Sequence, residues 1–325
     1  MRITLERQCA RFIENRDIVK SVFRWESGYL VPVAAACCGS ERADAERLRG
    51  ALRLIKREAG PFSAFRGMAR PVIAAMLAQE ADPETALRDA LNAYQALRGQ
   101  FMSSIYLPMA ALTLTRWSEN YHAAAEETRA VYEEMKKDHR FLTSSEDCVF
   151  AALLALSPYD AREAEREAEA CYIRLRTYFP AGNGLQSLSH VLALGEGDAD
   201  EKCDRTMTLY EELRRTTLRY GRGYELPVLG ALALIGRDPS ELAEDLSDAD
   251  EYLQGQKGYG VFGSGATSRR MHAALIVIEA SLDPEAKTLS HMAAGLAGVY
   301  AAQQAAIMAA CASAGAATAA SSSSH

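Results

Sequence analysis

The sequence has 325 residues, of which 49% are hydrophobic and 24% are charged, as in ordinary soluble globular proteins. Its formal net charge is −7 and it has no basic stripe with interleaved aromatic residues, which argues against nucleic acid as a partner. The N-terminal stretch MRITLERQCARFIEN lacks the apolar core of a secretory signal, and the seven cysteines form no CxxC pair. We therefore expect a cytoplasmic protein with free thiols and no metal held by cysteine.

Seven apolar blocks recur along the chain about every 40 residues, and each is predicted to be a buried helix. In chain order they are VAAACC at Val33, IAAMLA at Ile73, MAALTL at Met109, FAALLAL at Phe150, HVLALG at His190, GALALIG at Gly230 and HAALIVI at His272. Apolar residues elsewhere also recur at helical spacing, proline is scarce and β-branched runs are short. No strand is expected.

Charged, amphipathic segments follow most of these blocks and carry a tyrosine at one recurring position. The tyrosines are Tyr94, Tyr132, Tyr172, Tyr210 and Tyr252. Because they keep the same period as the apolar blocks, each block and the segment after it are predicted to form a helical hairpin, with the tyrosine packed between neighbouring hairpins. The joints inside the hairpins have a capping aspartate before proline, at Asp82-Pro83, Asp238-Pro239 and Asp283-Pro284.

The two kinds of helix predict two layers. A helix that is apolar nearly all round must be buried on several sides, whereas one with a wet face lies outside. We expect an all-α fold of seven αα-hairpin repeats that form a two-layer α/α toroid, because alanine and glycine let the inner helices approach closely. A tightly wound α-solenoid is the alternative. A single domain is predicted over residues 1–320, followed by a disordered tail at 321–325.

The run 288–320 carries no charge and is long enough to span a bilayer. It consists mostly of alanine, glycine and serine, so its hydrophobicity is marginal for a span. We predict a packed terminal helix that fills the last gap in the ring, with a tail anchor as the alternative. A membrane partner is not expected on this basis.

Seven polar, glycine-rich connections lead from an outer helix to the next inner helix, and we call them the rim. They contain RWESGY, FSAFRGMAR, FMSSIY, FLTSSED, GNGLQSLSH, YGRGYE and YGVFGSGATSRR. In an alternating stack of helices all seven lie at the same end. The candidate ligand-binding residues there are Glu26, Arg66, Arg70, Glu146, Asp147, Gln186, His190, Tyr224, Glu225, Arg269 and Arg270.

Two interpretations of these rim residues remain open. In the first, Glu146, Asp147 or Glu225 acts as acid, base or metal ligand, His190 carries a proton, and Arg66 or Arg70 holds an anion. In the second, the two adjacent carboxylates only stand at a helix N-terminus, where negative charge is favoured, and the arginines tie loops together. No catalytic residue, cofactor or defined metal site is assigned.

The glycines of GYGVFGSG, residues 258–265, imitate a phosphate-binding loop. No strand precedes them, which excludes the dinucleotide-binding and P-loop arrangements. They lead into a helix that carries Arg269 and Arg270, and this is a generic anion site.

Several long motifs resemble an uncharacterised bacterial family, mostly from Firmicutes, known only as domain of unknown function four-thousand-and-three. The motifs are RWESGY, FSAFRG, FLTSSEDCVFAALLALS, GNGLQSLSHVLALGEGDADEKC, YGRGYEL and AAQQAA in the tail, and they extend over nearly the whole chain. The resemblance implies a single full-length domain in a cytoplasmic bacterial protein. No activity, cofactor or site residue comes with it.

The best functional hypothesis is a binding or enzymatic site for a small anionic or polar molecule, in the mouth of the toroid at the rim. The alternative is a non-catalytic solenoid scaffold that binds a peptide or a protein along its helices. The oligomeric state is not predicted. Carboxylates, arginines and a histidine are concentrated in the rim connections, which favours the small-molecule hypothesis.

Overall fold

Helices form the regular structure of the residues that the computed structural model describes, which are 1–24, 30–218, 220–223, 225–259 and 265–281. Fourteen α-helices and a short 3-10 helix at Ala64–Arg66 occur in these ranges, and no strand does. The predicted all-α class is therefore confirmed. Glu26, Tyr224, Asp283-Pro284 and the predicted terminal helix and tail lie outside the described residues.

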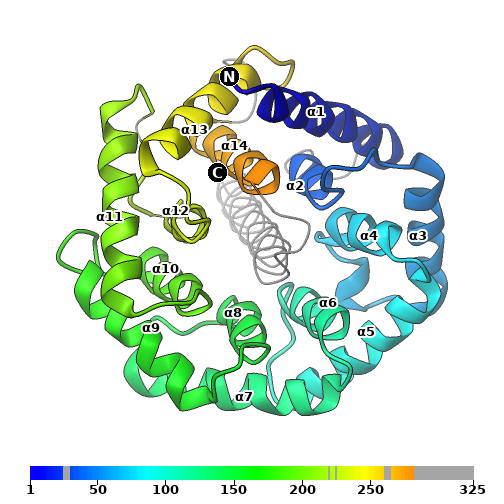
Figure 1. The fold of residues 1–325 in the computed structure, drawn as a ribbon. Coiled ribbons are helices and arrows are strands. Elements are labelled where there is room, and N and C mark those ends of the chain that lie inside the picture. Colours follow the sequence, from blue (N-terminus) through cyan, green and yellow to red (C-terminus); the bar gives the residue numbers. More distant parts are fainter. Residues whose placement is uncertain (25–29, 219, 224, 260–264, 282–325) are drawn as a thin grey trace, which may run out of the picture.

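The helices alternate between two layers. Those in the outer layer are α1 (Ile3–Phe23), α3 (Ala45–Glu58), α5 (Pro83–Arg98), α7 (Tyr121–Asp138), α9 (Ala161–Leu175), α11 (Ala199–Arg215) and α13 (Pro239–Gln254). Those in the inner layer are α2 (Leu30–Ala36), α4 (Arg70–Gln79), α6 (Leu107–Trp117), α8 (Asp147–Leu154), α10 (Asn183–Ala193), α12 (Leu226–Ala233) and α14 (Ala266–Ser281). Figure 1 shows the even-numbered helices toward the middle and the odd-numbered helices around them.

Burial explains why each helix takes its layer. Every residue of α8 and of α12 is buried, as expected for a helix that is covered on all sides. In α9 the buried residues instead form one stripe, which includes Ala164, Ala168 and Tyr172. All seven apolar blocks picked out in the sequence fall in inner helices.

Aspartate or asparagine side chains start six outer helices by accepting hydrogen bonds from backbone N–H groups of the first turn. These caps are Asp44, Asp82, Asn120, Asp160, Asp198 and Asp238. Two of them belong to the predicted joints at Asp82-Pro83 and Asp238-Pro239. Each cap marks the point where the chain passes from an inner helix into an outer one. The connections that lead from an outer helix to the next inner helix therefore follow the other end of the outer helix.

Four of the recurring tyrosines pack against an aromatic ring from the connection that follows the preceding outer helix. Ring centroids lie 5.4 Å apart for Tyr94 and Phe65, 4.9 Å for Tyr132 and Phe101, 4.2 Å for Tyr172 and His139, and 5.0 Å for Tyr210 and Phe179. All four tyrosines are buried. The predicted packing of tyrosine between neighbouring hairpins is confirmed at these positions.

The N-terminal helix α1 precedes the first apolar block, so it does not belong to any of the predicted pairs of an apolar block and the helix after it. It contacts α2 and α3 on one side and α13 and α14 on the other, so it stands in the outer layer between α13 and α3 (Figure 1). Arg16 Nη1 donates to the carbonyl of Lys257 at 2.8 Å, and Arg2 Nε donates to Asp245 at 2.9 Å. We call this meeting of α1 with α13 and α14 the seam.

Glycine allows two rim connections to approach each other closely. A Cβ atom on Gly184, in the first turn of α10, would lie 2.5 Å from the carbonyl oxygen of Gly223 in the next connection. Because the neighbour is backbone, it cannot rotate away. Gly184→Ala is therefore expected to lower the free energy of unfolding by about 1–3 kcal/mol, as overpacking does, measured by urea denaturation.

Gly50→Ala is the matched control for this prediction. Gly50 lies inside α3, and an added Cβ would meet only the Arg53 side chain, at 4.0 Å. This substitution should stabilise the protein by up to about 1 kcal/mol, because alanine is the better helix former. If both variants were stabilised, the close approach of the two connections would be contradicted.

Candidate functional site

Several predicted rim residues meet where α6, α8 and α10 begin. We call Tyr106, Thr143, Glu146, Asp147, Asn183, Gln186 and His190 the rim cluster; all are buried except Asn183, which is exposed. Tyr106 precedes α6, the next three residues come from the connection into α8 and its first turn, and the last three lie on α10. Consecutive connections thus bring residues about 40 positions apart into contact.

Glu146 is a buried carboxylate that links three hairpins. Asn183 Nδ2 donates a hydrogen bond to its Oε1 at 3.1 Å. Burial raises the pKa of this carboxyl group, and hydrogen bonds from Asn183 and Tyr106 partly offset the increase. No arginine or lysine is among the causes of this shift.

Asp147 is the first residue of α8 and is almost completely buried. The backbone N–H of Ser144 donates to its Oδ2 at 2.7 Å, as the helix-start interpretation requires. Burial nevertheless raises the pKa of Asp147 to about 7, and the neighbouring charge of Glu146 adds to the increase. This carboxyl group consequently changes its protonation near neutral pH.

His190 lies on α10 with its ring beside Phe150, and burial lowers its pKa to about 3. The imidazole is therefore neutral at physiological pH. Its Nδ1 is 3.8 Å from Asp147 Oδ1, which is too long for a hydrogen bond. Within the described part of the chain this buried Nδ1 has no hydrogen-bond partner.

Gln186 stands one turn before His190 on the same helix. Its Nε2 donates to Thr143 Oγ1 at 3.2 Å, which ties α10 to the connection into α8. Its Oε1 is buried and has no hydrogen-bond partner among the described residues. An unpaired buried acceptor costs free energy, so Gln186 Oε1 and His190 Nδ1 are the two atoms of the cluster that a ligand could satisfy.

Glu225 has different surroundings from the other two predicted carboxylates. It immediately precedes α12, and Arg270 Nη1 lies 3.7 Å from its Oε1. The hydroxyl of Tyr220 donates to its backbone carbonyl at 3.0 Å. Glu225 thus has a cation beside it, whereas Glu146 and Asp147 are held by neutral donors. A pocket shared by Glu225 and His190 stays a prediction.

The predicted arginines of the rim fit the interpretation in which they tie loops together. Arg66 donates to the carbonyl of Lys56 at 3.2 Å. Arg269 binds both carboxylate oxygens of Asp250, at 2.9 and 2.8 Å, so its charge is compensated. Arg70 begins α4 and is partly buried. An anion clamp at Arg66 or Arg269 therefore gains no support from these contacts.

Sequence reasoning missed a further buried carboxyl group, Glu165 on α9. Burial raises its pKa to about 8, and nearby carboxylates, including that of Asp147, add to the increase. Seven residues before the tyrosine, where α9 has Glu165, other outer helices have Leu87, Ala125, Cys203 or Asp245, and Asp245 is paired with Arg2 and Arg237. The signal was available, because Glu165 falls on the buried stripe of an otherwise charged segment.

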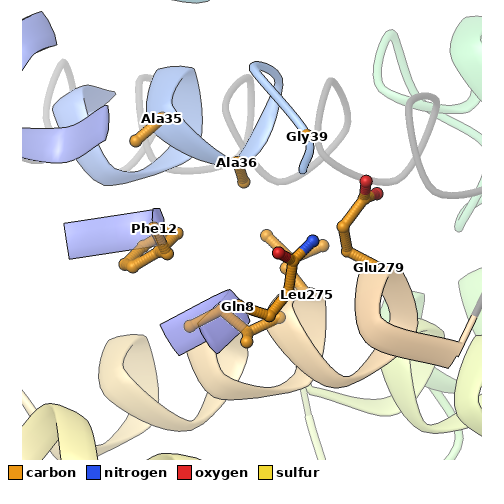
Figure 2. A pocket seen from close by; sticks show the side chains of 8 residues that line it. Gln8, Phe12, Ala35, Ala36, Gly39, Leu275 and Glu279 are labelled. Carbon is orange, nitrogen blue, oxygen red and sulfur yellow. The ribbon is translucent and has the colours of Figure 1, made fainter. Parts of the chain in front are cut away.

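A small cavity lies at the seam, between α1, α2 and α14, and is shown in Figure 2. Phe12 lies at one end of it, and the carboxylate of Glu279 lies beside Gly39 at the other. Its volume is about 20 Å³, which corresponds to roughly one water molecule. The site is too small for an organic ligand, and none of the predicted residues line it.

Neither a membrane-spanning helix nor a metal site is found among the described residues. No helix among them is long and apolar enough to cross a membrane. No group of three or more His, Cys, Asp or Glu side chains in these ranges is arranged to hold a metal ion.

Together, the fold and the rim cluster define an all-α protein in which buried carboxyl groups and a neutral histidine meet at the starts of inner helices. The chain belongs to the family described as Protein of unknown function (DUF4003), which it matches over residues 15–305. The family resemblance drawn from the sequence motifs is thereby confirmed.

The chain is also similar to the uncharacterized protein YeaA of Bacillus subtilis (strain 168), with 32% identity over 108 residues. This match covers 33% of the chain and 32% of the relative, so it spans about a third of either protein. No solved structure matches the chain.

Proposed function

We propose that the chain is a single domain over residues 1–320, built as a closed two-layer α/α toroid of seven hairpin units. Support comes from the alternation of inner and outer helices and from the contacts of each described outer helix with the next, including α13 with α1 (Figure 1). An open solenoid would leave α1 and α13 apart. A cytoplasmic location remains part of this proposal.

Within this fold, the proposed function is the binding of a small polar molecule by the rim cluster. The observation that carries the proposal is the pair of buried, unpaired atoms, Gln186 Oε1 and His190 Nδ1, beside two buried carboxyl groups. Buried polar atoms are normally paired, so an unpaired one needs an explanation, and a bound molecule that pairs with both atoms is the explanation proposed for these two. Both atoms lie on α10.

The chemistry of the cluster favours a ligand that donates hydrogen bonds. Gln186 Oε1 and Glu146 accept, and a neutral imidazole accepts at Nδ1 when its proton is on Nε2. No cation contributes to the pKa shifts of Glu146 or Asp147. A hydroxyl-rich or amine-bearing molecule therefore suits the cluster better than an anion does.

The same residues offer a proton-transfer function as an extension of binding. The pKa of Asp147 is raised to about 7, and a general acid or base works best when its pKa is near the working pH. The imidazole of His190 is 3.8 Å away and neutral, so it can help to position a ligand beside Asp147. Enzymatic activity at this site would use Asp147 as the acid or base.

A scaffold function is less well supported, because the tyrosines that could have formed a binding stripe on the outer helices are engaged in packing. Tyr94, Tyr132, Tyr172 and Tyr210 are all buried. Their rings contact neighbouring hairpins rather than solvent.

Gln186→Leu tests the proposed binding site. Polyols, sugars, amino acids and polyamines are screened by thermal shift against the wild-type protein, and the affinities of those that stabilise it are measured by calorimetry. Loss of the Gln186 acceptor should weaken such a ligand about tenfold, the effect of one hydrogen bond. Gln95→Leu, at an exposed position on α5, is the matched control and should bind normally. Equal affinity in both variants, or no stabilising compound, would contradict the proposal.

A further inference from the structure

Large apolar side chains protrude from consecutive rim connections. Phe62 is 100% exposed, Met102 is 90% exposed and Phe141 is 99% exposed. They belong to the connections into α4, α6 and α8, and Tyr178, which is 50% exposed, belongs to the connection into α10. Single exposed apolar residues are common, but recurrence at one structural position over four hairpins defines a surface.

The same end of the molecule is basic. Exposed arginines occur in three consecutive connections, those into α8, α10 and α12, at Arg140, Arg176 and Arg222. Outer helices also end in basic residues, such as Arg98 and Lys137. We call the protruding apolar residues and these basic residues the rim face.

Acidic residues lie at the start of most outer helices after their caps, for example Glu46, Glu84 and Glu163. Some of them pair with a basic residue near the end of the preceding outer helix, as Glu84 does with Arg57 and Asp200 with Arg174. In the described rim connections, by contrast, the exposed charged side chains are all basic.

Two pockets at the rim have basic linings. One lies beside Met102, has a volume of about 180 Å³ and is lined by Arg129, Lys136 and Ser104, among others. The buried Oγ of Ser104 has no hydrogen-bond partner among the described residues. Glu133 contacts both basic side chains, so the charge there is only partly free.

The other pocket is at the end of α1, with a volume of about 420 Å³, and its lining includes Lys20, Arg24 and Lys257. Arg16 and Asp17 also line it and are paired with each other. Both pockets offer donors and positive charge to a phosphate headgroup.

We propose that the rim face docks onto an anionic lipid membrane, with Phe62, Met102 and Phe141 entering the boundary between headgroups and acyl chains. A lipid surface can accept separate, protruding apolar side chains. A protein partner normally packs against a continuous apolar patch instead. The connections into α4, α6, α8 and α10 all follow an outer helix and lead into an inner one, so they lie at the same end of the two-layer stack.

Charge complementarity favours the same occupant. Arginines in the rim connections are attracted to anionic lipids. Docking of this kind needs no spanning helix. The prediction against a membrane partner concerned a span at 288–320, whereas the present proposal concerns the surface of the rim face. The proposal is independent of the ligand proposed for the rim cluster.

Vesicle flotation of the full chain tests this proposal. The wild-type protein should float with vesicles that contain phosphatidylglycerol, bind less as salt is raised, and stay unbound with pure phosphatidylcholine. Phe62→Ser and Phe141→Ser should each lower the partition coefficient about tenfold. Thermal stability should not change, because both side chains are exposed.

Matched controls separate docking from general effects. Ile3 is 77% exposed and lies at the start of α1, at the opposite end, so Ile3→Ser should bind vesicles like the wild type. Arg140→Glu should weaken binding, whereas Arg162→Glu, at the acidic end of α9, should not.

Three outcomes would overturn the proposal. One is no flotation with either vesicle type, and another is equal binding by the wild type and the double variant Phe62→Ser/Phe141→Ser. The third is self-association in sedimentation velocity that the double variant abolishes while vesicles remain unbound, since this would assign the rim face to a second copy of the chain.

Discussion

Asp147→Asn is expected to stabilise the protein at alkaline pH by up to about 4 kcal/mol and to have little effect at about pH 4. Burial raises the pKa of Asp147 from 3.8 to about 7 in the folded protein. Between these two values the folded protein keeps a proton that the unfolded chain has lost, so raising the pH destabilises the wild type. Above about pH 7 the carboxyl group is ionised in the folded protein as well as in the unfolded chain, so the free energy of unfolding of the wild type no longer falls as the pH rises.

Asparagine removes this dependence and keeps the local contact, because its side-chain oxygen can still accept from the N–H of Ser144. The difference between the two proteins should thus grow from about pH 4 to about pH 7 and then level off. Urea denaturation across this range measures it. Glu126→Gln, at an exposed position on α7, is the control and should follow the wild-type curve. Parallel curves for Asp147→Asn and the wild type would show that Asp147 ionises normally.

Tyr172→Ala is expected to lower the free energy of unfolding by about 2–4 kcal/mol. Tyr172 is buried between hairpins, with its ring centroid 4.2 Å from that of His139. Alanine leaves a cavity there and removes the ring contact, and the surrounding outer helices can close only part of the gap. Urea midpoints of the variant and the wild type give the difference.

Tyr172→Phe separates the ring from the hydroxyl and should retain most of the stability. Tyr178→Ala is a second control, because that tyrosine lies a few residues further on and is half exposed. It should cost less than about 0.5 kcal/mol, as ordinary surface substitutions do. An unchanged midpoint for Tyr172→Ala would mean that the recurring tyrosines do not hold hairpins together.

The layers of this fold were predictable because a helix that is buried on every side contains almost only apolar residues. A helix such as α8, buried over its whole length, must be apolar on every side, so FAALLAL is recognisable without knowing its neighbours. The caps of the outer helices are equally local, since Asp82 and Asp238 bond only to N–H groups two and three residues away.

The features that escaped prediction depend on which residues meet across hairpins. Nothing in the sequence of α1 indicates that it packs between α13 and α3, because its partners lie at the far end of the chain. Glu165 lies in a segment rich in charged residues, and only its place on the buried stripe of α9 distinguishes it from its neighbours.

The rim cluster was predicted in part, for a physical reason. The starts of inner helices come together wherever hairpins stack in register, so Glu146, Asp147, Gln186 and His190 could be grouped from spacing alone. The partners that decide their chemistry could not, since Asn183 and Thr143 are ordinary loop and helix-start residues in the sequence. The pairing of Arg269 with Asp250 likewise appears only in three dimensions.

The seam has a consequence for how the chain assembles. Its contacts join residues 241 and 243 positions apart, whereas the tyrosine packing joins neighbours within one period. Local hairpins can therefore form early, while the seam must await the ordering of nearly the whole chain. If two chains meet before the seam has formed, each could place its α1 against α13 and α14 of the other, which is domain swapping. Conversely, a circular permutant that joins α14 to α1 by a linker and opens the chain elsewhere would make this last step local.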